Sequence, residues 1–153
     1  MISRQSIDDF LAQEHIAFVG VSREPGGFAN TVYRRLRDGG RTLYPVNLQA
    51  NGPIEGDLAY ATLREVPDPI DGVIVMVPHI AAASVVHDAV TRGIPRVWLH
   101  RGLGQSTVDP VAVEIGESHG IVVIAGACPL MFDEPVKGIH RLHRIAARHR
   151  ISA

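Results

Sequence analysis

At 153 residues, with 46% hydrophobic and 20% charged residues, the chain has the length and composition of one globular domain. The composition excludes a disordered or fibrous protein, and the length excludes a binding domain joined to a separate catalytic domain. A formal net charge of −1 provides no overall attraction to nucleic acid or to an anionic membrane. Local features of the sequence must therefore identify any ligand.

The single cysteine, Cys128, excludes an intrachain disulfide and is typical of a reducing compartment. Asp8 and Asp9 lie where a signal peptide would need apolar residues, and no apolar run approaches the roughly 18 residues that span a bilayer. We therefore expect a cytoplasmic protein without a membrane partner.

Predicted helices and strands alternate along the chain. Ser6 and Asp9 have the spacing of a capping box, which predicts a short helix that ends near His15. The apolar run at 16–21 predicts a strand buried on both faces. The next elements are a helix from Ala29 to Gly39, a strand at 42–46, a short helix at 60–65, a strand at 73–77, a helix between Pro78 and Gly93, a strand at 97–99, a helix capped by Asp109, and a strand at 121–124.

This alternation predicts the α/β class, with a Rossmann-like, doubly wound parallel sheet of about five strands over residues 1–135. Ligands of such sheets bind at the carboxyl ends of the strands. The turn after the first strand is rich in glycine: Gly20 keeps it slim, while Gly26 and Gly27 allow backbone N–H groups to point at an anion. Ser22 and Arg23 add a hydroxyl and a cation. A tight turn without a ligand is the alternative interpretation.

The sequence disfavours NAD. A dinucleotide fold has the pattern G-x-G-x-x-G in this turn and an acidic residue at the end of the second strand, and the chain has neither. Asn47 ends the second strand instead and offers hydrogen bonds to a ribose or a base. Val77 and Pro78 offer an apolar wall of the kind that flanks an adenine.

Five short motifs follow the predicted strands in order: V-G-V-S-R-E-P, Y-P-V-N, V-M-V-P, Val97-Trp98 and Cys128-Pro129. With them, the segment 16–129 resembles small single-domain CoA-binding proteins and is similar to the nucleotide-binding domain of the succinyl-CoA synthetase α subunit. The resemblance implies coenzyme A or acyl-CoA as the ligand. It places Gly20, Val21, Ser22 and Arg23 at the diphosphate, Val46 and Asn47 at the adenosine, and Val77 and Pro78 at the adenine.

Lys137 is the only lysine, so a 3′-phosphate would need Arg23, Arg41 or Arg101. The synthetases also use a phosphohistidine on a second domain and a separate ATP-binding subunit, for which this length leaves no room. We therefore expect CoA binding without catalysis. An NAD(P)-binding enzyme or redox sensor, and an interaction scaffold with a Rossmann-like body, remain alternatives.

His100 and Cys128 are the candidate reactive residues. His100 follows the fourth strand, but no nucleophile and base pair surrounds it in the sequence, so we assign no catalytic residue. Cys128 is expected to be a small packed side chain, although a cation or a helix N-terminus beside it would make the thiol reactive. It could join His140 and His143 as metal ligands, but no fourth ligand is evident, and we expect no metal.

The C-terminal tail differs from the rest of the chain in charge. All sixteen acidic residues precede Val136 and five of the fifteen cations follow it, so the body carries −6, from ten cations against sixteen acids, and the tail carries +5. An apolar stripe runs through the tail at helical spacing, which predicts a basic amphipathic helix at 136–153. We expect it to pack on the same domain or on a second copy, forming a homo-oligomer. Nucleic-acid binding is disfavoured because stacking aromatic residues are missing.

Overall fold

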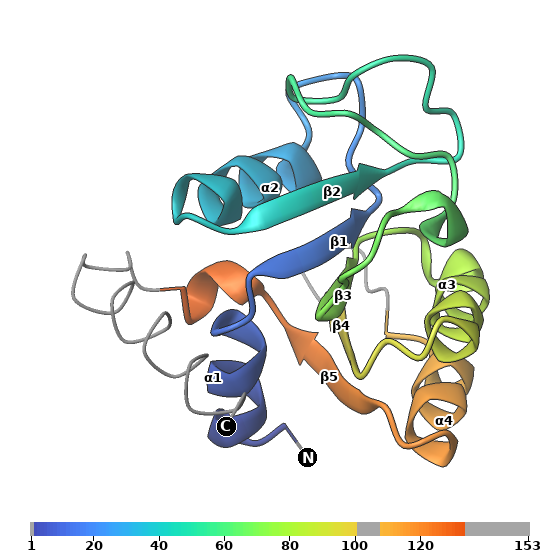
Figure 1. Cartoon of the computed structure of the whole chain (residues 1–153). Helices are drawn as coiled ribbons and strands as arrows, with labels where there is room; N and C mark the ends of the chain where they lie inside the picture. The colour runs from blue at the N-terminus through green and yellow to red at the C-terminus, as the bar shows by residue number, and fades with distance from the viewer. Residues whose placement is uncertain (1, 101–107, 134–153) are drawn as a thin grey trace, which may run out of the picture.

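The computed structural model describes residues 2–100 and 108–133. Five strands form one fully parallel sheet in the order β2-β1-β3-β4-β5 (Figure 1). The strands are β1 (His15–Val19), β2 (Thr42–Val46), β3 (Gly72–Val75), β4 (Arg96–His100) and β5 (Val122–Ala127). The predicted Rossmann-like α/β fold is therefore confirmed.

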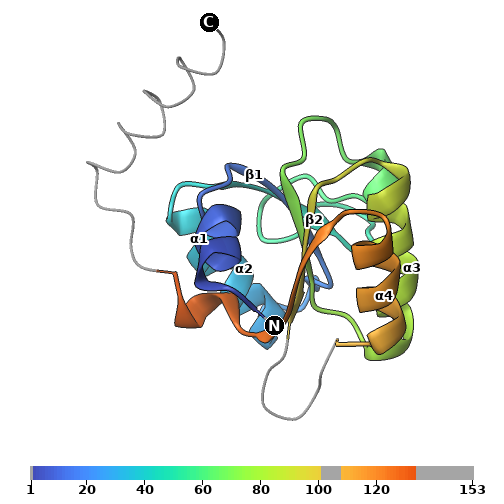
Figure 2. The ribbon, with the colours of Figure 1, turned by 90° about the horizontal axis from the view of Figure 1, so that it is seen from below.

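Helices cover both faces of the sheet. The helices are α1 (Arg4–Leu11), α2 (Phe28–Asp38), α3 (His79–Thr91) and α4 (Pro110–Ser118). Figures 1 and 2 show α1 and α2 on one face and α3 and α4 on the other. Two short 3-10 helices, η1 (Leu63–Glu65) and η2 (Pro129–Met131), complete the described elements.

The central strand β1 shows why both faces are covered. Ile16 and Phe18 belong to the apolar core on the α1 and α2 face, whereas Ala17 and Val19 belong to the core on the α3 and α4 face. All four side chains are at most 8% exposed. A strand with apolar side chains on both faces must lie between two helical layers, which places its carboxyl end at the middle of one sheet edge.

Two predicted elements were wrong in detail. The oxygen of the Ser3 side chain, not that of Ser6, caps α1 by accepting from the Ser6 amide (3.0 Å), and the helix ends at Leu11 rather than near His15. The helix predicted at 60–65 is only the 3-10 turn η1, so the connection from β2 to β3 is mainly a loop. The helix start predicted at Pro78 and the N-cap predicted at Asp109 are confirmed.

The predicted C-terminal helix at 136–153 lies outside the described residues. Within the described ranges, no helix is both long enough and apolar enough to cross a membrane.

Candidate functional site

The carboxyl ends of β1 and β3 lie side by side at the point where the strand order reverses. After β1 the chain forms β2 on one side of β1. It then crosses to the other side of β1, where β3, β4 and β5 follow in order. Ligands of open α/β sheets bind at such a switch point. The Met76 amide donates to the carbonyl oxygen of Val19 (2.8 Å), and the Gly20 amide donates to that of Val46 (3.0 Å). The loops after β1, β2 and β3 therefore leave the sheet together.

Gly20 is required by the sheet itself. Its φ is +113°, and a Cβ atom at this position would lie 2.1 Å from the carbonyl oxygen of Met76 and 2.6 Å from its carbonyl carbon. No real Cβ tolerates such distances from backbone atoms, and L residues rarely adopt this φ. Sequence analysis predicted that Gly20 keeps the turn slim for a ligand. The structure adds a second role that needs no ligand, because glycine here allows β1 and β3 to approach each other closely.

Residues 23–28 form an exposed turn that leads into α2. The N-cap of α2 is Gly27 and that of α3 is Pro78, and neither makes a side-chain capping hydrogen bond. By contrast, Ser3 and Asp109 cap α1 and α4. The two helices that begin beside the switch point therefore have first-turn N–H groups without a side-chain acceptor, and such groups bind anions.

The two remaining glycines of the turn leave open space before α2. A Cβ atom at Gly26 would meet no atom within 4 Å, and one at Gly27 would meet only the side-chain oxygen of Asn30, at 3.5 Å. Neither has a positive φ. The backbone does not need glycine at these positions, so their effect is to leave the N-terminus of α2 accessible.

Among the described residues, Arg23 has no carboxylate partner. Seven of the nine arginines in residues 2–100 and 108–133 form ion pairs: Arg4, Arg34, Arg37, Arg41, Arg64, Arg92 and Arg96. The other two are Arg23 and Arg35, both exposed. Arg23 lies in the turn at the switch point, whereas Arg35 lies in the last turn of α2. An unpaired guanidinium beside an uncapped helix is suited to a phosphate.

Ser22 is held by the buried side chain of Asn30. The Ser22 amide donates to Oδ1 of Asn30 (3.0 Å), and Nδ2 of Asn30 donates to the carbonyl oxygen of Ser22 (2.6 Å). The Ser22 hydroxyl oxygen accepts from the Glu24 amide (3.0 Å). The backbone N–H of Ser22 is thus already used within the protein, and its hydroxyl hydrogen is the group left for a ligand.

The side chain of Asn47 joins the loops after β1 and β2. Its Nδ2 donates to the carbonyl oxygen of Val21 (2.8 Å), and its Oδ1 accepts from the Gln49 amide (2.8 Å). The side chains of Val21 and Val46 are 0% and 2% exposed, in the two cores. These two predicted ligand residues are therefore buried, and their carbonyl oxygens already accept from Asn47 and from the Gly20 amide. Asn47 keeps one amide hydrogen.

Val77 and Pro78 extend from β3 toward the solvent. Val77 is half-buried against the core, and Pro78 is exposed at the start of α3. The exposed side chain of Ile80 follows in the first turn of this helix, and the exposed side chain of Leu48 follows Asn47. Two exposed apolar side chains therefore lie close in sequence to the residues predicted to contact the adenine.

Comparison with known proteins decides the family. A family described as CoA binding domain matches residues 14–133. The chain belongs to this family. The prediction made from the five motifs is therefore confirmed.

This CoA binding domain has relatives of two sizes. It is 26% identical over 130 residues to the α subunit of ADP-forming acetate–CoA ligase II from Pyrococcus furiosus, a match that covers 80% of this chain and 28% of that subunit. The uncharacterized protein YneT of Bacillus subtilis is 28% identical over 127 residues, covering 82% and 90% of the two chains. A solved hypothetical protein from Pyrococcus horikoshii has a TM-score of 0.78 and 26% identity, with 85% and 89% coverage.

The domain spans only a part of the ligases that it resembles. It covers 28%, 20% and 16% of the ADP-forming acetate–CoA ligase chains from Pyrococcus furiosus, Archaeoglobus fulgidus and Methanocaldococcus jannaschii.

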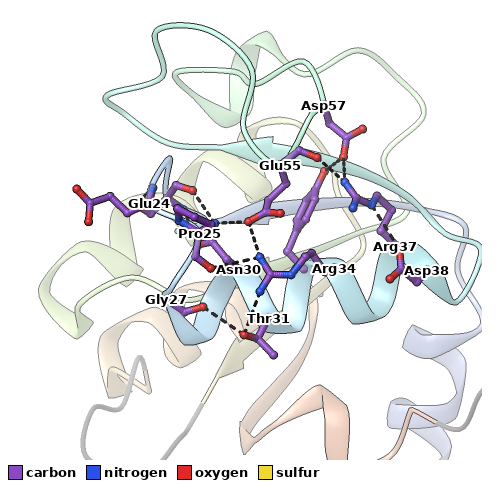
Figure 3. A network of polar contacts seen from close by, with 12 residues as sticks. Glu24, Pro25, Gly27, Asn30, Thr31, Arg34, Arg37, Asp38, Glu55 and Asp57 are labelled. Carbon is purple, nitrogen blue, oxygen red and sulfur yellow. Dashed lines mark hydrogen bonds and ion pairs between the residues drawn. The ribbon is translucent and has the colours of Figure 1, made fainter.

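Sequence reasoning missed a polar network beside the turn (Figure 3). It gave no role to Arg34 and Arg37 of α2. Nη1 of Arg34 donates to Glu55 (2.8 Å) and Nη1 of Arg37 donates to Asp57 (2.9 Å), and both carboxylates lie in the loop after β2. It did not single out Asn30, which is 1% exposed. The available signal was spacing, because Asn30 lies three residues before the buried Tyr33 and so shares its helix face.

Three other candidates remain, of which His100 packs beside Phe28, the first residue of α2. Arg41 was considered for a 3′-phosphate, but its side chain is 2% exposed, lies just before β2 at the opposite edge, and pairs with Asp133 (2.8 Å), so this assignment was wrong. His100 is buried at the end of β4 with its ring 5.7 Å from that of Phe28, and burial lowers its pKa. Cys128 is half-buried after β5.

The metal prediction is tested only in part. Within residues 2–100 and 108–133, no group of three His, Cys, Asp or Glu side chains could hold a metal ion. His140 and His143 lie outside these ranges, so the absence of a metal stays a prediction.

Proposed function

We propose that this CoA binding domain binds coenzyme A or acyl-CoA along the carboxyl edge of its sheet and catalyses no reaction alone. The diphosphate lies at Ser22, Arg23, Gly26 and Gly27, before the N-terminus of α2. The adenine lies between the loop at Asn47 and the residues Val77 and Pro78. The observation that carries the proposal is that Arg23, in the turn leading into the uncapped N-terminus of α2 at the switch point, forms no ion pair with any described residue.

Exposed apolar side chains support the placement of the adenine. Leu48 is 82% exposed and Ile80 is 83% exposed, and each lies within two residues of a proposed adenine contact. Large apolar side chains at a concave site are the usual lining for a base, because burial removes their surface from water.

The local charges disfavour NAD(P) as the ligand. The loop after β2 contains two carboxylates, Glu55 and Asp57, but they pair with Arg34 and Arg37 and are not free to bind ribose hydroxyls.

The test is titration calorimetry with CoA, acetyl-CoA, dephospho-CoA, NAD, NADP and ATP. We expect an isotherm with CoA or acetyl-CoA. Arg23→Ala should weaken this binding by about ten- to a hundredfold, because one charge-assisted hydrogen bond contributes about 1.5 to 3 kcal/mol. Arg35→Ala is the matched control, since it removes the other unpaired guanidinium and should leave affinity unchanged. A clear isotherm with NAD and none with CoA would contradict the proposal, as would equal affinities of the Arg23→Ala and wild-type proteins.

A further inference from the structure

We propose that Glu55 is a positioning residue that holds the ligand-binding turn in shape from the loop after β2. The inference rests on the proposed function, because it assigns the turn at residues 22–27 to the diphosphate. Figure 3 shows the carboxylate of Glu55 beside Asn30 and Arg34, whose side chains reach Ser22 and Pro25 in this turn. In this role Glu55 affects ligand binding through the shape of the turn, without contacting the ligand.

The first arm runs through Asn30 to Ser22. The Nδ2 group of Asn30 donates both to Oε1 of Glu55 (2.7 Å) and to the carbonyl oxygen of Ser22 (2.6 Å), while its Oδ1 accepts from the Ser22 amide. Both amide hydrogens of a side chain that is 1% exposed are therefore used. Without Glu55, one of them would be buried without an acceptor, and the amide would be free to turn away from Ser22.

The second arm runs through Arg34 to Pro25. Nη1 of Arg34 donates to the same Oε1 atom of Glu55 (2.8 Å) and to the carbonyl oxygen of Pro25 (3.3 Å). The hydrogen bond from Asn30 is the main cause that lowers the pKa of Glu55, and Arg34 adds to it. A single carboxylate oxygen thus links Ser22 and Pro25 of this turn to another loop.

The backbone conformation of Glu55 is unfavourable for a glutamate, which indicates that the side-chain contacts of Glu55 offset this cost. Glu55 has φ +52°, and within the described residues it is the only non-glycine residue with a positive φ. It is followed by Gly56 with φ +82°, and Ile54 and Asp57 close the turn with reciprocal hydrogen bonds of 3.0 and 2.9 Å. Such turns prefer Asn, Asp or Gly at the position of Glu55. A glutamate here is less favourable for the backbone, and its contacts offset that cost.

Asp57 provides a matched control on the same loop and the same helix. Its carboxylate accepts hydrogen bonds from Arg37 (2.9 Å) and from the Tyr33 hydroxyl (2.7 Å). Burial is the main cause that raises the pKa of this hydroxyl. None of the hydrogen bonds of Asp57 reaches residues 22–27. Loss of Asp57 therefore loosens the loop without releasing the turn.

The experiment compares Glu55→Gly, Glu55→Gln and Asp57→Ala in the full chain. Glu55→Gly removes the carboxylate but suits the positive φ, and Glu55→Gln keeps an acceptor for Asn30. Calorimetry measures the Kd for CoA, and amide hydrogen exchange measures the protection of Ser22 relative to the core amide of Ile74. We expect Glu55→Gly to raise the Kd about tenfold, equivalent to about 1.4 kcal/mol, and to speed exchange at Ser22. Glu55→Gln and Asp57→Ala should stay within about twofold of wild type in both measurements.

The two readouts separate this inference from the proposed function. If wild type does not bind CoA, the proposed function fails, while the exchange of Ser22 still tests the positioning role. If Glu55→Gly leaves Ser22 exchange unchanged, or if Asp57→Ala speeds it equally, Glu55 does not position the turn. If exchange changes as expected but wild type and Glu55→Gly bind CoA equally, Glu55 holds the turn but does not position it for the ligand, and the proposed role in CoA binding is overturned.

Discussion

Replacing Gly20 with alanine is a severe perturbation of the sheet. The new Cβ would lie 2.1 Å from the carbonyl oxygen of Met76, so the backbone of β1 or β3 must move. Because Met76 leads directly into Val77 and Pro78, the movement would also reach the proposed adenine contacts.

The size of the effect follows from two costs. Placing an L side chain at a φ of +113° costs at least about 1 to 2 kcal/mol, the cost known for the left-handed region. Forcing an extra carbon into a packed site costs about 1 to 3 kcal/mol more. Together they predict a loss of about 2 to 5 kcal/mol in the free energy of unfolding, a large share of the roughly 5 to 15 kcal/mol that stabilises a typical domain.

Urea denaturation of Gly20→Ala, Gly26→Ala and wild type measures this loss directly. Gly26→Ala is the control, because its Cβ would meet no atom within 4 Å and its φ is not positive, so its stability should match or slightly exceed that of wild type. A free energy of unfolding for Gly20→Ala within about 1 kcal/mol of the wild-type value, at an unchanged m value, would refute the reasoning. A loss of CoA binding in Gly20→Ala would not identify a phosphate contact, which is why Arg23→Ala carries the functional test.

Three further predictions concern stability. Asp133→Ala should cost about 3 kcal/mol, because it leaves the buried guanidinium of Arg41 without its charge partner, and the double variant Arg41→Met with Asp133→Ala should recover part of the loss in urea titrations. Asp109→Ala should cost about 1 kcal/mol by removing the cap that accepts from the Val111 amide (3.0 Å), and a cost near zero would contradict that role. Burial lowers the pKa of His100, so the unfolded chain binds more protons just below pH ~6.5 and stability should fall as pH drops through that range; His100→Gln should reduce this slope in denaturation curves at pH 7 and pH 5.

Local sequence patterns were sufficient for the architecture. Continuous apolar strands separated by helical periodicity require helices on both faces of a parallel sheet, and the glycine-rich turn after β1 marked the switch point. The cap at Asp109 was also predictable, since it depends on residues adjacent in the chain. The alternative cap at Ser6 failed because Ser3 offers the same chemistry one turn earlier.

The composition of the site depended on contacts between segments distant in sequence. Asn30 and Glu55 are 25 residues apart, and nothing in their local sequence indicates a shared hydrogen bond. Arg34 lies in the middle of α2 and Arg41 shortly after its end, yet one supports the turn and the other is buried with Asp133.

The sequence by itself therefore determined the class of fold and the family, and it predicted the edge of the sheet for a ligand, because these follow from periodicity and from short motifs. Only the tertiary structure decided which polar groups at that edge remain available. At this edge the carboxylates of Glu55 and Asp57 are neutralised by Arg34 and Arg37, and folding alone brings these partners together. Within the described residues Arg23 has no such partner, while Ser22 and Asn47 are largely engaged within the protein.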